Sequence, residues 1–448
     1  MKKDNKRFPR AKLRKAGGQI QIGDVLSIFH QDAQEADARA FAKLMTHVKE
    51  VDEKHSTVLL VQVENETGLL GDSRDASRAA DERFNSPVPA KLLRILENDW
   101  DSLHPEMQRT LTYFRSQQQN QNTSWPSVFG ASVHTDELFM AYHYAQYLEV
   151  VASAGRSAYP LPLYTNVWQN YNSSTADNNF PIVVGGGSDP GDYPSGGGTI
   201  NVLDIWQLFA PSLDFIAPDV YLNDYASSCA AYRHRDQPLF IPEQRRDEYG
   251  ARRLWTAYGS YQALATSPFG IDTLEVAENP YARHYGLLRS VAPHVLQAQR
   301  DNSSIGFFFD ELPTTTGAKD PSPPVTAKFG PWILTISRSF VFGHPGPGSG
   351  MVIHKGSNKF LLIGWGFQVT FAHTSAPFTG ILRFEEKEAL PNGELKTLRM
   401  LNGDETRSGS FCIMPNEEID YGGFPICVTI PARTGIAEAE PYSLEDSE

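Results

Sequence analysis

The spacing of apolar positions changes from helical to strand-like within the first 65 residues. Apolar side chains recur every three or four positions within residues 32–51 and predict one amphipathic helix. Asp32, with Glu35 three residues later, predicts a capping box at its start. The following segment, residues 58–63 (VLLVQV), is almost continuously apolar and rich in β-branched side chains. Such a run is typical of a strand buried on both faces of a parallel sheet.

Short apolar runs and helical patterns then alternate as far as residue 300. The further candidate strands are residues 161–167, 180–184, 214–220, 238–241 and 269–271. The candidate helices are residues 135–153, 252–265 and 281–300. Thr135 is the expected N-cap of the first of these helices, and Gly155 is its expected stop. This alternation predicts an α/β fold with a parallel sheet.

The pattern changes after residue 312. Residues 313–325 have the Pro- and Thr-rich composition of a linker. The candidate strands beyond it are residues 332–337, 351–354, 360–365, 381–385 and 426–430, with hairpin-type Asn-Gly pairs at 392–393 and 402–403. We therefore expect four parts: an α/β domain at 1–312, the linker, an antiparallel β-sandwich at 326–435, and a frayed acidic tail at 436–448.

Composition and charge exclude several classes of function. The 448 residues include 40 Lys and Arg against 53 Asp and Glu, a net charge of −13 that disfavours a nucleic-acid partner. No apolar run reaches the roughly 20 residues that span a bilayer, and the basic first 15 residues lack the apolar core of a signal peptide. The three cysteines, Cys229, Cys412 and Cys427, can form one disulfide at most and match no metal-ligand spacing. We expect neither a metal nor a cofactor.

Polar residues gather where candidate strands end. Glu64, Asn65 and Glu66 follow the strand at 58–63, and Glu243 follows the strand at 238–241. Glycoside hydrolysis requires two carboxyl groups, and two at the ends of strands could supply them. One protonates the leaving oxygen, and the other attacks the anomeric carbon or activates water. The alternative is that each is a helix cap or a solvated loop residue, which is the commoner role of a single Glu in this position. Two glycine triplets, 185–187 and 196–198, lack the Lys-Ser/Thr of a phosphate loop and are interpreted as substrate loops.

The segment Gln62-Val63-Glu64-Asn65-Glu66 resembles the QVENE motif of glycoside hydrolase family 35, the β-galactosidase-like family. Residues 61–75 and 267–272 (SPFGID) resemble the branch of that family with a C-terminal DUF5597-type β-domain. The resemblance implies a retaining (β/α)₈ TIM barrel at 1–312, with Glu66 as acid/base and Glu243 as nucleophile. Thr67 stands where many members have Tyr, and this difference concerns the substrate more than the reaction.

Polar and aromatic residues at the ends of candidate strands are the expected substrate-binding residues. Asn65 would hydrogen-bond the sugar 2-hydroxyl, and Glu64 would bind sugar hydroxyls or form a salt bridge inside the barrel. Tyr221 would donate to the nucleophile or be an ordinary strand-end aromatic residue. Asn166 would offer a hydrogen bond, while Trp168 would stack on a sugar or belong to the core.

The count of strands departs from a complete barrel. Three βα units before residue 58 would need about 90 residues, whereas 57 are present. We therefore expect a chain that lacks the first three barrel strands, with exposed sheet edges and impaired activity. A complete form would be secreted or periplasmic and would act on a galactoside oligosaccharide or polysaccharide. The competing hypothesis is a non-catalytic carbohydrate-binding or scaffold protein in which the β-sandwich binds the ligand.

Overall fold

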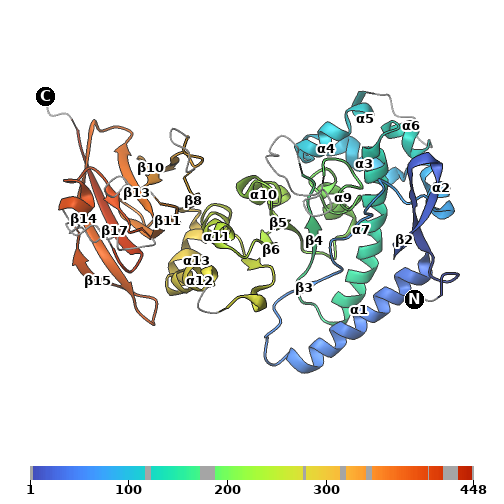
Figure 1. Ribbon diagram of the computed structural model, residues 1–448, viewed down its shortest axis with the longest axis horizontal. Helices are drawn as coiled ribbons and strands as arrows, with labels where there is room; N and C mark the ends of the chain where they lie inside the picture. The colour runs from blue at the N-terminus through green and yellow to red at the C-terminus, as the bar shows by residue number, and fades with distance from the viewer. Residues whose placement is uncertain are drawn as a thin grey trace. The chain divides into compact units, whose positions relative to one another are not determined.

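The computed structural model describes residues 4–116, 123–171, 187–275, 279–312, 319–339, 346–401, 403–416 and 432–445. The chain forms two compact units, Met1–Pro242 and Glu243–Glu448, which are described separately. Figure 1 labels their helices and strands. The expected domain at 1–312 and the expected linker at 313–325 stay predictions.

The first unit begins with a hairpin that the sequence analysis did not anticipate. Strands β1 (Arg10–Arg14) and β2 (Ile20–Leu26) pair antiparallel and are followed by helix α1 (Gln31–Asp52). The helix expected at 32–51 is confirmed, but its expected capping box is wrong. His30 precedes the helix without a side-chain cap, and Asp32 lies within the first turn.

Most helices of this unit lie between the first and second strands of its parallel sheet. They are α2 (Arg78–Phe84), α3 (Ala90–Asn98), α4 (Pro105–Thr110), α5 (Thr112–Ser116), α6 (Trp125–Phe129) and α7 (Val133–Ala158). Helix α7 lies beside α1 (Figure 1). It was expected at 135–153, but Ser132 is its N-cap and accepts a hydrogen bond from the Thr135 backbone N–H at 3.1 Å. The helix also continues past Gly155, which does not stop it.

The sheet of the first unit is parallel, as the sequence predicts. Strand β3 (Val61–Gln62) pairs with β4 (Leu163–Trp168), and β4 pairs with β5 (Phe215–Val220). Every residue of β5 is buried, as are all of β4 except Trp168. Helix α9 (Leu203–Phe209) packs against β5, and α7 packs against α9. Helix α10 (Tyr225–Ala231) follows β5. The expected strand at 180–184 lies outside the described residues.

Strand β6 (Phe240–Gln244) crosses the boundary between the units. The second unit continues with α11 (Glu248–Tyr261), β7 (Ala265–Pro268), α12 (Pro280–Ser290) and α13 (Ala292–Asp301). Three expected bounds are corrected here. The helical pattern at 252–265 begins earlier and ends at Tyr261, and the pattern at 281–300 forms two helices broken at Val291. The strand lies at Ala265–Pro268, before the expected 269–271.

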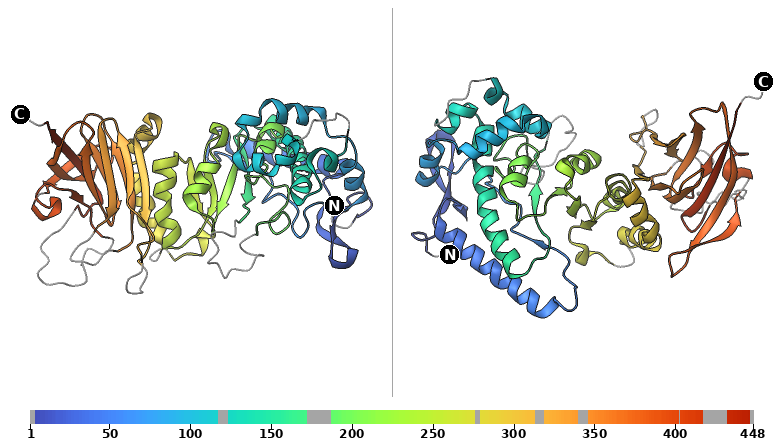
Figure 2. Two further views of the ribbon diagram at one scale, coloured as in Figure 1. Left: turned by 90° about the horizontal axis from the view of Figure 1, so that it is seen from above. Right: turned by 180° about the vertical axis from the view of Figure 1, so that it is seen from behind.

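Two antiparallel sheets form the rest of the second unit (Figure 2). The smaller contains β16 (Cys412–Ile413), β13 (Phe367–His373), β10 (Trp332–Arg338) and β9 (Val325–Phe329), in that order. The larger contains β15 (Leu395–Met400), β14 (Phe378–Ala389), β17 (Ile436–Leu444), β12 (Phe360–Trp365), β11 (Gly348–His354) and β8 (Ser304–Phe309). A shared aromatic core joins their facing sides, as in a β-sandwich. The opposite face of the larger sheet packs against α11, α12 and α13.

Residues 436–444 of the expected tail are not frayed. Ile436–Leu444 form β17, an interior strand that pairs with β12 on one side and β14 on the other. The turn at 392–393 joins β14 to β15 as expected. The other expected turn, at 402–403, includes residue 402, which lies outside the described residues. The strand expected at 426–430 lies wholly outside them. Of the cysteines, Cys229 and Cys412 are buried free thiols.

The structure bears out a mixed α/β protein with a parallel sheet and antiparallel sheets. Its finer assignment to a TIM barrel remains a proposal. No helix in the described ranges combines the length and the apolar character needed to cross a membrane.

Candidate active site

The backbone turns abruptly where β3 ends. Glu64 and Glu66 both have left-handed conformations, with φ of 58° and 43°, and they flank Asn65. A left-handed conformation is unfavourable for a residue with a Cβ and persists only where surrounding contacts enforce it. Strain of this kind concentrates at ligand-binding and catalytic sites. The end of β3 is therefore a candidate for a ligand-binding or catalytic role.

Asn166 links the ends of the three parallel strands. Its Oδ1 accepts a hydrogen bond from the Glu66 backbone N–H at 2.8 Å. Its Nδ2 donates to Asp219 Oδ2 at 2.8 Å and to Asn65 Oδ1 at 3.3 Å. Gln62 Nε2 also donates to Asn65 Oδ1, at 3.1 Å. Because Asn166 is 1% exposed, these contacts hold the turn at Glu66 against β4 and β5.

A small pocket of about 110 Å³ lies beside this turn. Its lining consists of Glu66, Trp168, Gln169, Asp219, Tyr221, Leu222 and Asn223. Three residues that the sequence analysis singled out, Glu66, Trp168 and Tyr221, thus come together, with Asn166 and Asn65 hydrogen-bonded behind them. The pocket offers carboxylate, amide and phenol groups, which can donate hydrogen bonds to a hydroxyl-rich ligand or accept them from it, together with an indole ring.

Asp219 lines the pocket but is not among the residues expected from the sequence. It is 3% exposed and lies directly opposite Trp168 in the β4–β5 register. A signal was available, because Asp219 is an acidic residue inside an otherwise apolar strand, one position before the strand ends. Buried acidic residues require partners, and here Asn166 supplies one.

Glu64 lies away from the pocket. Its carboxyl group faces Asp37 of α1, and Asp37 also accepts a hydrogen bond from the Tyr147 hydroxyl at 3.1 Å. The residue as a whole is exposed, yet protein atoms crowd its carboxyl end. Burial and the neighbouring Asp37 carboxylate raise the pKa of Glu64 to about 7. This placement favours an internal contact over direct sugar binding.

Glu243 belongs to the second unit and is described there by itself. It lies in β6, next to the fully buried Gln244. Gln244 Nε2 donates to the Tyr281 hydroxyl at 2.6 Å and to the Gly250 carbonyl at 3.1 Å. These two bonds fix the end of β6 against α11 and α12, so the backbone that carries Glu243 is anchored.

The loop after Glu66 is held by a second loop. Leu69 and Ser195 exchange two backbone hydrogen bonds of 2.9 Å, and the Gly71 N–H donates to the Gly191 carbonyl at 2.8 Å. Gly68 has a φ of 152°, and a Cβ there would meet Pro194 atoms at 2.5 Å. The glycine triplet at 196–198 is buried in this contact. Its expected role as a substrate loop is therefore corrected, because these glycines allow close packing of the two loops.

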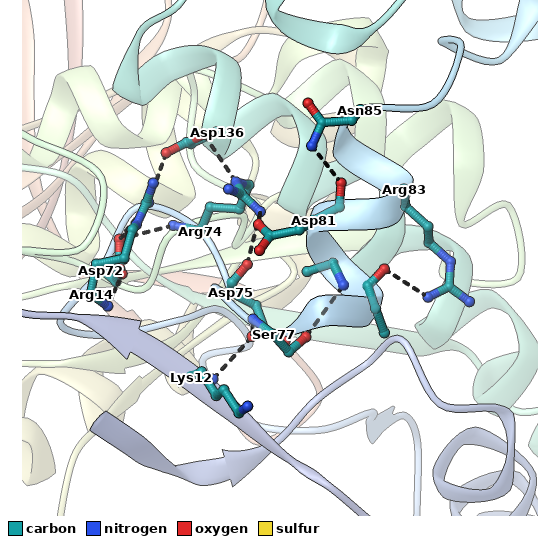
Figure 3. A network of polar contacts seen from close by, with 12 residues as sticks. Lys12, Arg14, Asp72, Arg74, Asp75, Ser77, Asp81, Arg83, Asn85 and Asp136 are labelled. Carbon is teal, nitrogen blue, oxygen red and sulfur yellow. Dashed lines mark hydrogen bonds and ion pairs between the residues drawn. The ribbon is translucent and has the colours of Figure 1, made fainter. Parts of the chain in front are cut away.

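A network of charges anchors the same loop to the hairpin and to α7 (Figure 3). Arg14 Nη2 contacts Asp72 Oδ1 at 2.6 Å and Asp136 Oδ2 at 2.9 Å. Arg74 Nε contacts Asp136 Oδ1 at 3.3 Å. Burial would raise the pKa of Asp72, but hydrogen bonds and charge from Arg14 outweigh it and hold that pKa below its usual value. The ion pairs of Arg14 and Arg74 thus fix the loop to the hairpin and to α7.

Comparisons with known proteins identify one domain. Residues 281–413 match the family described as a domain of unknown function, DUF5597. This match begins at α12 and includes β8, and so starts before the expected linker. No curated protein matches the chain.

Solved structures also show similarity. The structure of a β-galactosidase from the psychrophilic Marinomonas ef1 is 13% identical, with a TM-score of 0.38. The alignment covers 66% of this chain and 48% of the β-galactosidase, so the chain spans about half the length of that protein.

Proposed function

We propose that this protein is a retaining glycoside hydrolase that cleaves terminal β-galactosides. In this proposal, residues 1–312 form a barrel of the (β/α)₈ kind, Glu66 is the acid/base and Glu243 is the nucleophile. The observation that carries the proposal is the pocket of the first unit, which gathers Glu66, Trp168 and Tyr221 around buried Asp219. The resemblance of residues 62–66 to the QVENE motif supports it independently.

The reaction divides into two displacements. In the first, Glu66 donates its proton to the leaving glycosidic oxygen while the Glu243 carboxylate attacks the anomeric carbon and forms a glycosyl-enzyme. In the second, Glu66 removes a proton from water, which attacks the same carbon and releases Glu243. The anchored backbone at Glu66 and the fixed end of β6 would keep each group in place between the steps.

The other residues would bind the sugar. Asn65 would hydrogen-bond the 2-hydroxyl, a contact that strengthens in the transition state. Trp168 would present an aromatic face to the ring, and Tyr221 would donate a hydrogen bond to the nucleophile. Asn166 acts mainly through Glu66, because its amide is already committed to that backbone and to Asp219. Glu64 is the weakest of the expected sugar ligands, because its carboxyl group faces Asp37.

The test is covalent trapping with an activated 2-deoxy-2-fluoro-β-galactoside. The expected result is a mass increase of one fluorosugar per chain, with the label on the peptide that contains Glu243. Replacement of Glu243 by Gln should abolish labelling, whereas Glu248→Gln in the exposed first turn of α11 should leave it intact. Labelling of another carboxylate would refute the nucleophile assignment.

Hydrolysis of an aryl β-galactoside tests the acid/base. Glu66→Gln should lose most of the turnover, because no group then protonates the leaving oxygen or activates water; general acid–base catalysis contributes about 10²–10⁴-fold. Azide should restore glycosyl transfer in Glu243→Ala and yield the azide of inverted configuration. Saccharide binding without turnover or labelling would instead favour a non-catalytic carbohydrate-binding protein.

A further inference from the structure

A second and larger cavity adjoins the pocket at Glu66 within the first unit. Its volume is about 730 Å³, against about 110 Å³ for the pocket. Ligand sites for small molecules usually measure about 300–1,000 Å³, so the larger cavity is the one with room for a ligand of several rings. It is walled by α4, α7, α10 and the loop after β4, through residues that include Arg109, His134, Gln169, Asn201, Asn223 and Ala231.

The pocket and the cavity share a wall. Gln169 and Asn223 line both of them. Gln169 Nε2 donates to the Asp219 carbonyl at 2.9 Å on one side, and its Oε1 accepts from Ser228 Oγ at 3.1 Å on the other. Asn223 Nδ2 donates to the Asn170 carbonyl at 2.9 Å. The shared residues are thus held in place, and the cavity directly adjoins the pocket.

The lining of the cavity fits an uncharged, hydroxyl-rich ligand. Amide and hydroxyl side chains predominate, and they can both donate to and accept from sugar hydroxyls. Among the described lining residues, the acidic ones are Glu106, Asp189 and Asp224, while Arg109 and His134 are the basic ones. Arg109 is paired with Glu106 at 2.8 Å, so it is not available to neutralise an anionic ligand. A carboxylated or sulfated saccharide would meet net repulsion.

The floor of the cavity is rigid. Asn201, which is 2% exposed, donates through Nδ2 to Glu137 Oε2 at 3.3 Å and to the Tyr193 hydroxyl at 3.0 Å. The Tyr193 hydroxyl in turn donates to Glu137 Oε1 at 2.8 Å. Glu137 is fully buried within α7. A preformed floor of this kind lowers the ordering cost of binding.

We propose that the cavity is a second saccharide subsite, and that the protein acts on uncharged oligosaccharide or polysaccharide chains in preference to glycosides of a single sugar. The sugar whose bond is cleaved lies at Glu66, and the rest of the chain extends past Gln169 and Asn223 into the cavity. This inference rests on the proposed function for the identity of the first sugar. The volume of the cavity, the wall that it shares with the pocket and the charge of its lining support the rest of the inference.

Two neighbouring alanines of α10 provide a matched pair of variants. Ala231 lines the cavity, whereas Ala230 is exposed on the same helix and does not line it. A phenylalanine at position 231 would fill part of the cavity, while the same residue at position 230 would enter solvent. Should Ala231→Phe prove unfolded by circular dichroism, Ser227→Phe blocks the same cavity from another exposed position of the helix.

The experiment is calorimetric titration of the full chain with methyl β-galactoside, β-1,4-galactotetraose and trigalacturonate. We expect the tetrasaccharide to bind at least about tenfold more tightly than the methyl glycoside, a difference of about 1.4 kcal/mol, and trigalacturonate to bind more weakly than either. Ala231→Phe should remove the advantage of the tetrasaccharide, and Ala230→Phe should keep it. Equal affinities for the two neutral ligands, or an advantage that survives Ala231→Phe, would overturn the subsite.

The outcome is separable from that of the proposed function. Fluorosugar labelling of Glu243 without any preference for longer chains would leave the glycosidase proposal standing and refute the subsite. A preference for longer chains that Ala231→Phe abolishes, without labelling or turnover, would support the cavity as a saccharide site and refute the catalytic proposal.

Discussion

Replacing Glu64 by glutamine should stabilise the protein above neutral pH and have little effect below pH 5. Folding places the Glu64 carboxyl group in a crowded environment next to Asp37, which raises its pKa from 4.5 to about 7. Between these two values the folded state holds a proton that the unfolded state has released. Stability therefore falls as the pH rises through this interval, and the full loss is present above pH 7.

The magnitude follows from the size of the shift. A change from 4.5 to about 7 corresponds to about 3 kcal/mol if each pKa unit contributes about 1.4 kcal/mol. Because Glu64 as a whole residue is exposed, solvent partly screens the repulsion at its crowded carboxyl end, and we discount the effect to about 1 kcal/mol. Glutamine has nearly the same shape and carries no charge, so Glu64→Gln should recover this amount at pH 8 and nothing at pH 4.5.

The assay is denaturant unfolding of the wild type and Glu64→Gln across pH 4.5–8.5. Glu50→Gln, on an exposed position of α1, removes the same charge away from Asp37 and serves as the control. The difference in unfolding free energy should grow with pH for Glu64→Gln only. A Glu64→Gln variant that is less stable than the wild type at pH 8 would refute the reasoning, since it would show that the ionised carboxylate is favourably paired.

Two further substitutions test the scaffold that holds the Glu66 loop. Gly68→Ala should destabilise the protein by about 1–3 kcal/mol, because it combines a disfavoured backbone conformation with a clash against Pro194. Its control, Gly286→Ala, lies in open space within α12 and should stabilise the protein by about 0.5–1 kcal/mol. Thermal unfolding measures both variants, and equal effects would contradict the close contact at Gly68. Arg14→Met should cost about 1–2 kcal/mol, because it removes hydrogen bonds to two largely buried carboxylates. Arg78→Met removes an ion pair that is fully exposed and should leave the unfolding free energy almost unchanged. A similar loss in both variants would contradict the network.

Hydrophobic periodicity identified elements better than it identified their ends. The long apolar pattern at 135–153 is unmistakably helical, but the choice between Ser132 and Thr135 as N-cap depends on side-chain geometry that both residue types can supply. Gly155 does not end α7, because glycine only weakens a helix interior and tertiary contacts can outweigh that cost.

The C-terminal strand β17 shows why composition misleads. Residues 436–444 (IAEAEPYSL) alternate apolar and polar side chains, which is a strand signal, but their acidic content suggested a tail. The acidic side chains lie on one side of the strand, where Glu438 contacts Lys355 and Lys387. Long-range pairing of this kind, like that of β8 with β11, depends on contacts that no local pattern contains.

The sequence predicted several of the residues that gather at the pocket. Asn166, Trp168 and Tyr221 lie in or directly after apolar runs, and the structure places Trp168 and Tyr221 in the pocket with Glu66, while Asn166 bonds the Glu66 backbone. Asp219, an acidic residue inside the apolar strand β5, was not among the expected residues. Its role depends on Asn166 in the neighbouring strand, and the sequence does not state which strands are neighbours.

The left-handed turn explains how two glutamates two positions apart can serve different purposes. In an extended strand, residues i and i+2 share a face, and Glu64 would then point the same way as Glu66. The positive φ at both residues interrupts this alternation, so that Glu64 faces Asp37 while Glu66 lines the pocket. The strain stored in this turn is therefore compensated by Asn166 and the loop contacts, and the turn gives the pocket a single glutamate from this segment of the chain.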